Sequence, residues 1–250
     1  MKPPLNGKVV LVTAGARRVG AAICRRLHAA GARVMVNYLR SGKEARALVN
    51  ALNAQRADSA AMVKADLLER GAPALLVKTT LTIFGRLDAL VNNASSFYPT
   101  PVGKLNESAW HDLIGTNLKA PLFIAQAAAS ELKKRRGCIV NIVDIHAEFP
   151  LKDYVIYSIA KGGLAALTRS LARELAPAVR VNGVSPGPIL WPDADSWKSP
   201  RTRKNILDRS LLKRIGEPDD IARTVEFLIA SAPYVTGQII AVDGGRSIAL

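Results

Sequence analysis

A tyrosine and a lysine spaced four residues apart, with an acid upstream, are the side chains in this sequence best suited to chemistry. Tyr157 and Lys161 fall in segment 154–176, which has Ala, Leu and Gly at helical spacing, so a helix would present both on one face. Asp144 follows an apolar, β-branched run, 138–143, that predicts a buried strand. A free phenol has a pKa of about 10, and a nearby cation favours its ionised form, which suits general acid–base catalysis. The Tyr–Lys pair alone can arise by chance, so its meaning depends on a cofactor and a pocket elsewhere in the chain.

The elements that must position these residues alternate between strands and helices along the whole chain. Apolar runs predict strands at 8–13, 33–38, 59–64, 87–91, 138–143, 179–184 and 238–242, with helical patterns between them and no repeat or linker. This alternation is typical of a doubly wound parallel sheet with helices on both faces, and we expect one Rossmann-type α/β domain of about seven strands over residues 1–250. In such a sheet, ligands bind beyond the carboxyl ends of the strands, where Asp144 is placed. The polar, Pro-containing segment 192–214 is expected to be a substrate-side loop.

The turn after the first strand has the composition of a phosphate-binding turn. Residues 14–20 read Ala-Gly-Ala-Arg-Arg-Val-Gly, and a helix is predicted from there to about residue 30. A strand, a small-residue turn and a helix together place backbone N–H groups and a helix N-terminus against a pyrophosphate. Only two glycines stand in the turn, so the signal is modest on its own. The candidate cofactor contacts here are Thr13, Gly15, Arg17, Arg18 and Val19.

The end of the second predicted strand bears on the choice between NADH and NADPH. An acidic residue there would bond the free ribose 2′-hydroxyl, whereas an arginine accommodates a 2′-phosphate. The run 37–41 contains no acid, and Arg40 and Ser41 follow Tyr38 in it. NADPH is therefore favoured, with Arg17 adding a second cation, although Arg40 could instead be merely exposed before the next helix. Ser41 is also a predicted N-cap for that helix, with Glu44 completing a capping box.

Three further strand ends supply candidate site residues. The third strand ends at Asp66 and Leu67, where Asp66 could meet the adenine. The fourth runs into the loop 92–99, whose small polar and aromatic residues could line a pocket or simply form a turn with satisfied Asn side chains. The following helix, 107–136, contains Asn117, and a kink is expected at Pro121. The sixth strand ends in residues 185–191, which are the third set of candidate site residues at a strand end.

Composition narrows the functional classes. The chain has 250 residues, 49% of them hydrophobic, which suits a globular domain, and no segment approaches the length of a membrane span. Its two cysteines are isolated, so neither a metal site nor a redox pair is indicated, and a reducing cytoplasmic compartment is expected. The net charge of +15 is concentrated at 133–136 and 198–214. Our first interpretation of these clusters is solvated surface, and the second is attraction of anionic ligands. A nucleic-acid site ranks last, because no aromatic residues are interleaved with the charges.

Taken together, these motifs resemble those of the short-chain dehydrogenase/reductase family over nearly the whole chain. The markers, in family order and at family spacing, are 13–20, 92–94, Asn117, Tyr157 with Lys161, 186–187 and 243–245. Any one of them is a weak signal, whereas their conjunction is highly specific.

Within the family, the chain is most similar to the pteridine reductases. Arg18 stands in place of a turn glycine, the run 95–99 follows the Asn-Asn-Ala motif, and Asp144 replaces the usual catalytic serine. The run 37–41 also resembles the NADPH-selecting segment of this subgroup. Ala14, in place of the first turn glycine, departs from both groups.

The resemblance implies NADPH-dependent reduction of a pterin or folate. It adds to the cofactor contacts Asn93, Ala94, Ser95, Lys161, Pro186 and Gly187. It places the pterin between the nicotinamide and a set of substrate contacts, Phe97, Arg18, Ser95, Asp144, Tyr157, Leu190 and Trp191. A hydride would pass to a ring carbon of a dihydropteridine such as dihydrobiopterin, dihydromonapterin or dihydrofolate. A proton would reach the neighbouring ring nitrogen from Tyr157, assisted by Lys161, Asp144 and Asn117.

Two other functions remain open at this point. One is a ketone or 3-oxoacyl-thioester reductase of the same family, in which Asp144 is a local substitution. The other is a binding or regulatory protein that senses NADPH, against which intact Tyr157, Lys161 and Asn117 argue. Independently of the substrate, Asp144 could serve only to cap or order the loop at 146–148. The family likeness implies a homotetramer that acts on a small molecule, and we expect no metal, nucleic acid or membrane to take part.

Overall fold

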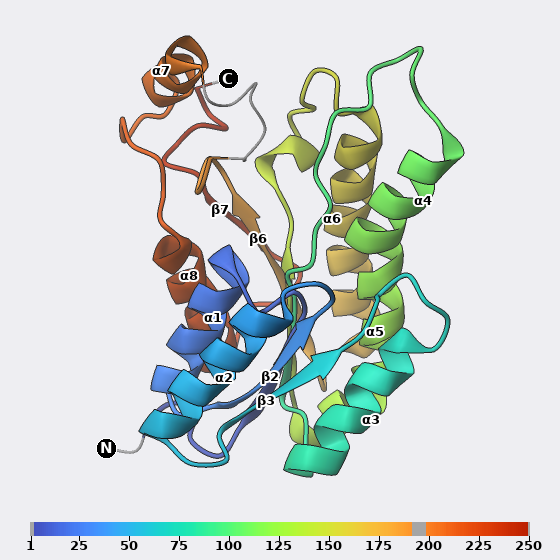
Figure 1. Cartoon of the computed structure of the whole chain (residues 1–250), viewed down its shortest axis with the longest axis vertical. Helices are drawn as coiled ribbons and strands as arrows, with labels where there is room; N and C mark the ends of the chain where they lie inside the picture. Colours follow the sequence, from blue (N-terminus) through green and yellow to red (C-terminus); the bar gives the residue numbers. More distant parts are fainter. Residues whose placement is uncertain (1–2, 192–198, 250) are drawn as a thin grey trace.

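The computed structural model describes residues 3–191 and 199–249, and within them seven strands form one parallel sheet with helices on both faces (Figure 1). The strands are β1 (Val9–Val12), β2 (Arg33–Tyr38), β3 (Ala60–Lys64), β4 (Ala89–Asn92), β5 (Cys138–Ile142), β6 (Arg180–Pro186) and β7 (Ile239–Val242). The α-helices are α1 (Arg18–Ala29), α2 (Gly42–Gln55), α3 (Ala72–Phe84), α4 (Glu107–Ile114), α5 (Ala120–Arg135), α6 (Val155–Leu175), α7 (Pro200–Asp208) and α8 (Pro218–Ala230). The predicted Rossmann-type class is confirmed.

The strand order β3-β2-β1-β4-β5-β6-β7 reverses direction between β1 and β4. The chain first moves outward from β1 to β3, then returns to the other side of β1 at β4 and moves outward again to β7. Because the connections leave in opposite directions here, a crevice opens beyond the carboxyl ends of β1 and β4. The turn after β1 and the loop after β4, both predicted to carry site residues, begin at this crevice.

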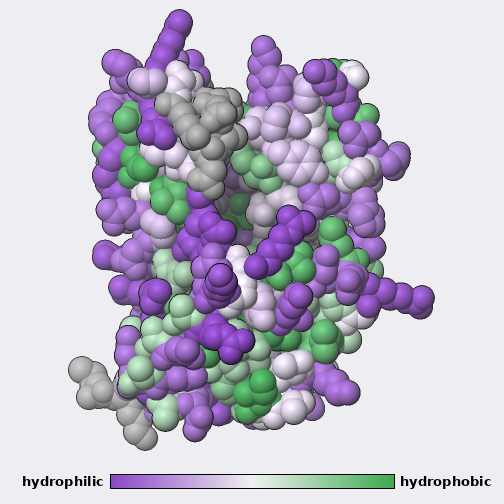
Figure 2. All heavy atoms as spheres, viewed as in Figure 1, coloured by the Kyte–Doolittle hydropathy of each residue, from purple (hydrophilic) through white to green (hydrophobic). Residues whose placement is uncertain are grey.

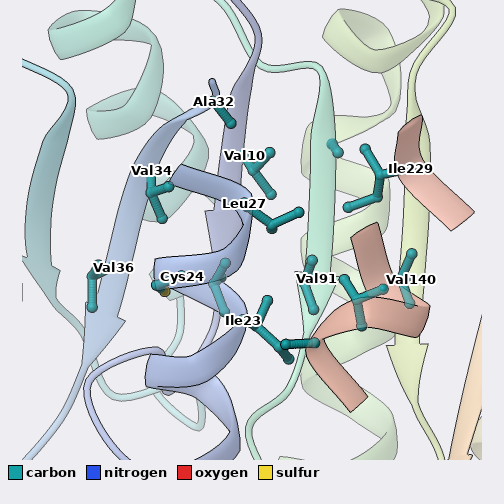
Figure 3. Close-up of a cluster of buried hydrophobic side chains, with 14 of the residues drawn as sticks. Val10, Ile23, Cys24, Leu27, Ala32, Val34, Val36, Val91, Val140 and Ile229 are labelled. Carbon is teal, nitrogen blue, oxygen red and sulfur yellow. The ribbon is translucent and has the colours of Figure 1, made fainter. Parts of the chain in front are cut away.

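The sheet divides the hydrophobic core into two layers. Along β1, Val10 and Val12 belong to the layer with α1, α2 and α8, whereas Val9 and Leu11 belong to the layer with α3 and α5. Figure 3 shows the first layer, with side chains of α1 packed against those of β1 and β2. Burial on both faces explains why the strands are continuous apolar runs, and each fully buried Val or Leu contributes about 1.5–3 kcal/mol.

Most predicted element boundaries agree with the structure to within two residues, and β2 matches its prediction at both ends. The capping box predicted for α2 is wrong. Within the described chain, the side chain of Ser41 makes no cap hydrogen bond, and Glu44 instead lies 3.8 Å from the guanidinium of Arg17. In the described residues, the carboxylate thus lies near a cation on the turn after β1 and completes no capping box.

Two further predictions need correction. The helix predicted over 107–136 is interrupted by a π-helical turn, η1 (Gly115–Lys119), so the irregularity lies before Pro121 rather than at it. Part of the loop predicted over 192–214 is the helix α7, which Ser199 caps by accepting a hydrogen bond from the N–H of Thr202 at 3.5 Å. The Ser-Pro pair at 199–200 is a helix start signal that the basic composition obscured. Residues 192–198 of that prediction lie outside the described residues.

The 21-residue helix α6 carries the predicted Tyr–Lys pair near its N-terminus. Its buried face includes Ala160, Leu164 and Thr168, and it packs against β6 and η1. Gly163 permits the contact with η1, since a Cβ atom there would lie 2.6 Å from Cδ2 of Leu118. In the part of the chain that the structure describes, neither α6 nor any other helix combines the length and the hydropathy needed to cross a bilayer.

Candidate active site

The carboxyl ends of the strands open onto a cleft of about 1200 Å³, and Figure 2 shows the surface hollowed there. Pockets for single small ligands usually measure about 300–1,000 Å³, so this cleft has room for a dinucleotide together with a substrate. Its lining includes most of the predicted site residues: Arg17, Arg18, Val19, Tyr38, Arg40, Ser41, Asp66, Leu67, Asn93, Ala94, Ser95, Phe97, Asp144, Tyr157, Lys161, Pro186, Gly187, Leu190 and Trp191. The other three, Thr13, Gly15 and Asn117, are buried behind the lining.

Gly20 lets the turn after β1 close tightly against β4. A Cβ atom at this position would lie 2.3 Å from the carbonyl oxygen of Ala14 and 2.7 Å from Nδ2 of Asn93, distances that no side chain tolerates. Within the described chain, α1 starts without a side-chain cap at Arg17 and without an acid in its first turn. Its N-terminal N–H groups and its positive dipole end are therefore suited to an anion.

Ala14 occupies a backbone conformation that favours glycine. Its φ is 47°, in the left-handed region, and its N–H donates to Oδ1 of Asn37 at 3.2 Å. The residue is exposed and lines the cleft. The alanine therefore costs about 1–2 kcal/mol of backbone strain, rather than a packing defect in the core.

Thr13 and Asn93 join the turn after β1 to the loop after β4. The hydroxyl of Thr13 accepts hydrogen bonds from the N–H groups of Asn93 and Ala94, at 2.9 and 3.0 Å. In return, Nδ2 of Asn93 donates to the carbonyl oxygens of Thr13 and Ala14, at 3.0 and 3.2 Å. Thr13 thus positions both loops from behind the cleft wall.

Arginines gather where the adenosine half of a dinucleotide would lie. Arg40, Ser41 and Arg17 all line this end of the cleft, and Arg40 is exposed. The ion pair of Arg17 with Glu44 is half exposed on both sides, at 55% and 48%, so it contributes little to stability and leaves Arg17 able to rearrange. Asp66 lines the same end and accepts a hydrogen bond from the N–H of Leu68 at 3.0 Å.

The candidate proton-delivery group is assembled at the end of β5. The Tyr157 hydroxyl donates to Oδ2 of Asp144 at 2.6 Å. Nζ of Lys161 donates to the carbonyl of Ile142 at 2.9 Å and lies 5.7 Å from the centroid of the Tyr157 ring. Tyr157 is 3% exposed and Lys161 is 2% exposed. A phenol, a carboxylate and an ammonium are therefore held together out of water.

The expected lowering of the Tyr157 pKa by Lys161 is not observed. Burial, and then the charge and the hydrogen bond of Asp144, raise the pKa of Tyr157 well above its ordinary value, although a hydrogen bond with Ser95 acts the other way. Burial lowers the pKa of Lys161 to about 8, with the charge of Asp144 opposing that shift. Sequence spacing could not reveal how deeply the phenol is buried. Near neutral pH, Tyr157 is protonated and Lys161 is charged.

The second carboxylate oxygen of Asp144 has a structural task. Oδ1 accepts a hydrogen bond from the N–H of His146 at 2.9 Å and so caps the short 3₁₀ helix η2 (Ile145–Ala147). Oδ1 orders the loop and Oδ2 accepts the hydrogen bond from Tyr157, so the structure is compatible with both the loop-ordering and the proton-transfer interpretation of Asp144.

Asn117 reaches the site from the π-helical turn η1. It is fully buried, its Nδ2 donates to the carbonyl oxygens of Ser96 and Leu113, and its Oδ1 accepts from the Ser95 hydroxyl at 2.7 Å. π-helical turns commonly occur at functional sites. Asn117 thereby fixes the loop that carries Ser95 and, through it, the surroundings of Tyr157.

Phe97 forms an aromatic cluster with two tyrosines. Its ring stacks on Tyr154 with centroids 4.6 Å apart and meets Tyr157 edge-on at 4.8 Å. The ring is partly exposed and lines the cleft. It is therefore placed where a flat ligand next to Tyr157 could pack on it.

Sequence reasoning missed a buried polar network under the site. Nδ2 of Asn92 donates to Asn141 at 2.8 Å, and Asn141 donates to Thr168 at 2.9 Å, which links β4, β5 and α6. Buried Asn and Thr in otherwise apolar segments were the available signal. Several cleft-lining residues were also missed. His146 lies just beyond the end of β5, whereas the others follow no strand-end pattern: Asp112, Thr116, Leu151, Thr202, Ile206 and Arg246.

Comparison with known proteins identifies the family of the chain. Residues 14–247 match a family model described as enoyl-(acyl carrier protein) reductase. Pteridine reductase 1 of Leishmania tarentolae is 37% identical over 280 residues, covering 96% of each chain. The 3-oxoacyl-(acyl-carrier-protein) reductase FabG of Staphylococcus aureus is 36% identical over 241 residues, covering 95% of this chain and 97% of the relative. A Staphylococcus epidermidis protein of the same name is 35% identical, covering 95% and 98%. With its seven-stranded parallel sheet and its Tyr157–Lys161 pair, the chain belongs to the short-chain dehydrogenase/reductase family of oxidoreductases.

Proposed function

We propose that this chain is an NADPH-dependent pteridine reductase, which converts a dihydropteridine to its tetrahydro form. The observation that carries the proposal is the 2.6 Å hydrogen bond from the Tyr157 hydroxyl to Asp144. This bond places a carboxylate beside the tyrosine, at the position where most members of the family have the neutral hydroxyl of a serine. An ionised carboxylate only accepts hydrogen bonds, so it suits a substrate edge that carries N–H donors, as a pterin edge does.

Residues along the cleft suit the pyrophosphate, the 2′-phosphate and the ribose of NADPH. The turn after β1 and the uncapped start of α1 suit the pyrophosphate, and Arg17 and Arg40 suit a 2′-phosphate. Lys161 suits the ribose hydroxyls beside the nicotinamide. Gly187 lets the end of β6 approach the chain after β7, since a Cβ atom there would lie 2.6 Å from Cβ of Asp243. When bound, NADPH supplies the hydride.

The chain's own residues would orient the pterin and deliver the proton. Phe97 offers a ring for stacking, and Asp144 accepts from the amino and imino groups of the pterin edge. Because the pKa of Tyr157 is raised, its proton is in place at neutral pH for the ring nitrogen beside the carbon that takes the hydride. Proton transfer leaves a negative charge on the phenol, which the buried ammonium of Lys161 offsets.

The alternative, a ketone or 3-oxoacyl-thioester reductase, draws support from the FabG relatives, whose identity to this chain is similar. The site geometry favours it less. A carbonyl oxygen gains negative charge as it is reduced and needs hydrogen-bond donors around it. Asp144 would repel that charge, and it raises the pKa of the phenol that must donate to it.

We also infer a single-domain, cytoplasmic homotetramer that acts on a small molecule. Both cysteines are free and buried, as expected for a reducing compartment. Leu122 and Phe123 on α5 and Ile159 on α6 are apolar residues between 37% and 49% exposed, which a subunit interface would cover. Light scattering after size exclusion tests the assembly, with a mass of about four times 26.8 kDa expected.

Replacement of Asp144 by serine tests the proposed activity. Asp144→Ser should lower kcat/KM for dihydrobiopterin by about 30- to 1000-fold, through loss of a charge-assisted bond and of proton relay. The affinity for NADPH should barely change.

Asp144→Asn is the matched control, because an amide oxygen can still cap η2 at His146 and only the charge is lost. If Asp144 merely orders the loop, the asparagine variant keeps its activity and the serine variant loses only thermal stability. Wild-type turnover of a 3-oxoacyl thioester without turnover of any dihydropteridine would overturn the proposal.

A further inference from the structure

We infer that Arg246 binds an anionic group of the substrate, so that the preferred substrates carry a carboxylate or a phosphate beyond the reducible ring. This inference rests on the proposed function and specifies the class of substrate within it. Arg246 lines the same cleft as Tyr157 and Asp144, although it lies at the far end of the sequence.

A turn after β7 holds Arg246 at the cleft. Gly244 and Gly245 have φ values of 65° and 78°, which favour glycine, and a Cβ atom at Gly245 would lie 2.8 Å from Cδ1 of Leu211. The carboxylate of Asp243 accepts hydrogen bonds from the N–H groups of Gly245 and Ser247, at 2.9 and 2.7 Å. The turn thus packs the C-terminal segment against the chain that follows α7, and Arg246 comes to the cleft wall.

The guanidinium of Arg246 retains donors for a ligand. Nη1 donates to the carbonyl oxygen of Ile206 at 3.2 Å, which uses one of five N–H groups. Over 3–191 and 199–249, no carboxylate oxygen lies within the 4.0 Å of an ion pair with it. The carboxylate nearest in sequence, Asp243, is already occupied by two backbone N–H groups. A substrate anion would provide this cation with a hydrogen-bonded partner, whereas the charge of Asp243 acts on it from beyond ion-pair distance.

The electrostatic surroundings of Arg246 favour an anion. Burial and the positive charge of Arg209 lower the pKa of Arg246, and the charge of Asp243 offsets this only in part, so a bound anion would stabilise the guanidinium further. A second guanidinium, that of Arg18, lines the same cleft and donates to the carbonyl oxygen of Trp191 at 3.2 Å. Arginine binds carboxylate and phosphate in planar, bidentate geometry, and such bonds are stronger than those to neutral groups. A substrate without an anionic tail would gain less from Arg246.

Paired substrates that share a ring test this inference. 7,8-Dihydroneopterin and its 3′-phosphate differ only in the anion, and dihydrofolate presents carboxylates instead, so the three compounds separate phosphate from carboxylate recognition. In Arg246→Gln, kcat/KM should fall by about 10- to 100-fold for the anionic substrates and by less than about twofold for dihydroneopterin. Arg246→Lys should retain part of the preference. Arg173→Gln, an exposed arginine at the far end of α6, is the control for net charge and should match the wild type.

The outcomes separate this inference from the proposed function. Selective loss with one or both anionic substrates supports the role of Arg246 and identifies the anion. Equal loss with all three, together with a lower Tm, would mean that Arg246 only holds α7 through Ile206, and it would overturn the inference while leaving the reductase intact. If the wild-type protein reduces no dihydropteridine, both are overturned.

Discussion

The two ends of the cleft are built in different ways. At the proposed cofactor end, the shape depends on close backbone approach, which Gly20 permits and the bonds between Thr13 and Asn93 secure. At the proposed catalytic end, Tyr157 and Lys161 are buried, and the charge of Asp144 adds to the raised pKa of Tyr157 and opposes the lowered pKa of Lys161. The first end should therefore be sensitive to added volume and tolerant of altered charge. The second should respond strongly to a change of one atom.

The largest effect expected at the catalytic end comes from removing one oxygen. Tyr157→Phe keeps the ring that packs on Phe97 but deletes the proton donor, so kcat should fall by about 10²- to 10⁴-fold while NADPH binding is nearly unchanged. Single-turnover kinetics and cofactor titration measure the two effects separately. A near-normal kcat would mean that another group supplies the proton, and the contrast between the two ends would be lost.

The pH dependence should also report on the catalytic end. Lys161 is a cation below its pKa of about 8 and neutral above it, whereas Tyr157 stays protonated through this range because its pKa is raised. The value of kcat/KM for NADPH, which reflects the free enzyme, should therefore fall by about tenfold per pH unit above pH 8. Lys161→Arg, whose charge persists, should remove this alkaline limb. A limb that begins only near pH 10, the ordinary range of a lysine, would show that burial does not lower the pKa of Lys161 and would contradict this assignment.

At the cofactor end, a change of charge should have a moderate and selective effect. Arg40→Ala should reduce the preference for NADPH over NADH by about tenfold, the value of one charge-assisted bond, and leave kcat intact. Arg46→Ala, an exposed change on α2 away from the cleft lining, is the control. Equal use of both cofactors by the wild-type protein would reject the assignment of this end to a 2′-phosphate.

The smallest effect is expected from relieving the backbone strain at Ala14, which lies at the cofactor end. Ala14→Gly removes the left-handed strain at φ 47° and should raise the free energy of unfolding by about 0.5–1 kcal/mol, which corresponds to a few degrees in Tm. Thermal denaturation without cofactor measures it. A lower Tm would show that flexibility gained in the unfolded chain outweighs the relief of strain.

Local pattern predicted the fold, whereas many of the predicted cleft residues, such as Phe97 and Trp191, came only from the family resemblance. β2 and the helix that carries Tyr157 follow from periodicity, because burial on both sides of a parallel sheet requires continuous apolar runs. Properties that depend on distant contacts did not follow. The direction of the Tyr157 pKa shift depends on burial by several elements, and the position of Arg246 depends on a turn that packs against Leu211.

The π-helical turn η1 makes the site depend on the count of residues as well as on their kinds. A π-helical turn is what an α-helix becomes when it accommodates one extra residue. Deletion of one residue between Gly115 and Lys119 would restore the regular α-helical register. Because the wide turn absorbs the extra residue, α4 and α5 would keep their mutual orientation, and the change would fall within the turn that carries Asn117. Asn117 would then no longer face Ser95, even with every other residue unchanged. Related chains that differ in length here would therefore have diverged in the site itself, in a manner that an identity score does not register.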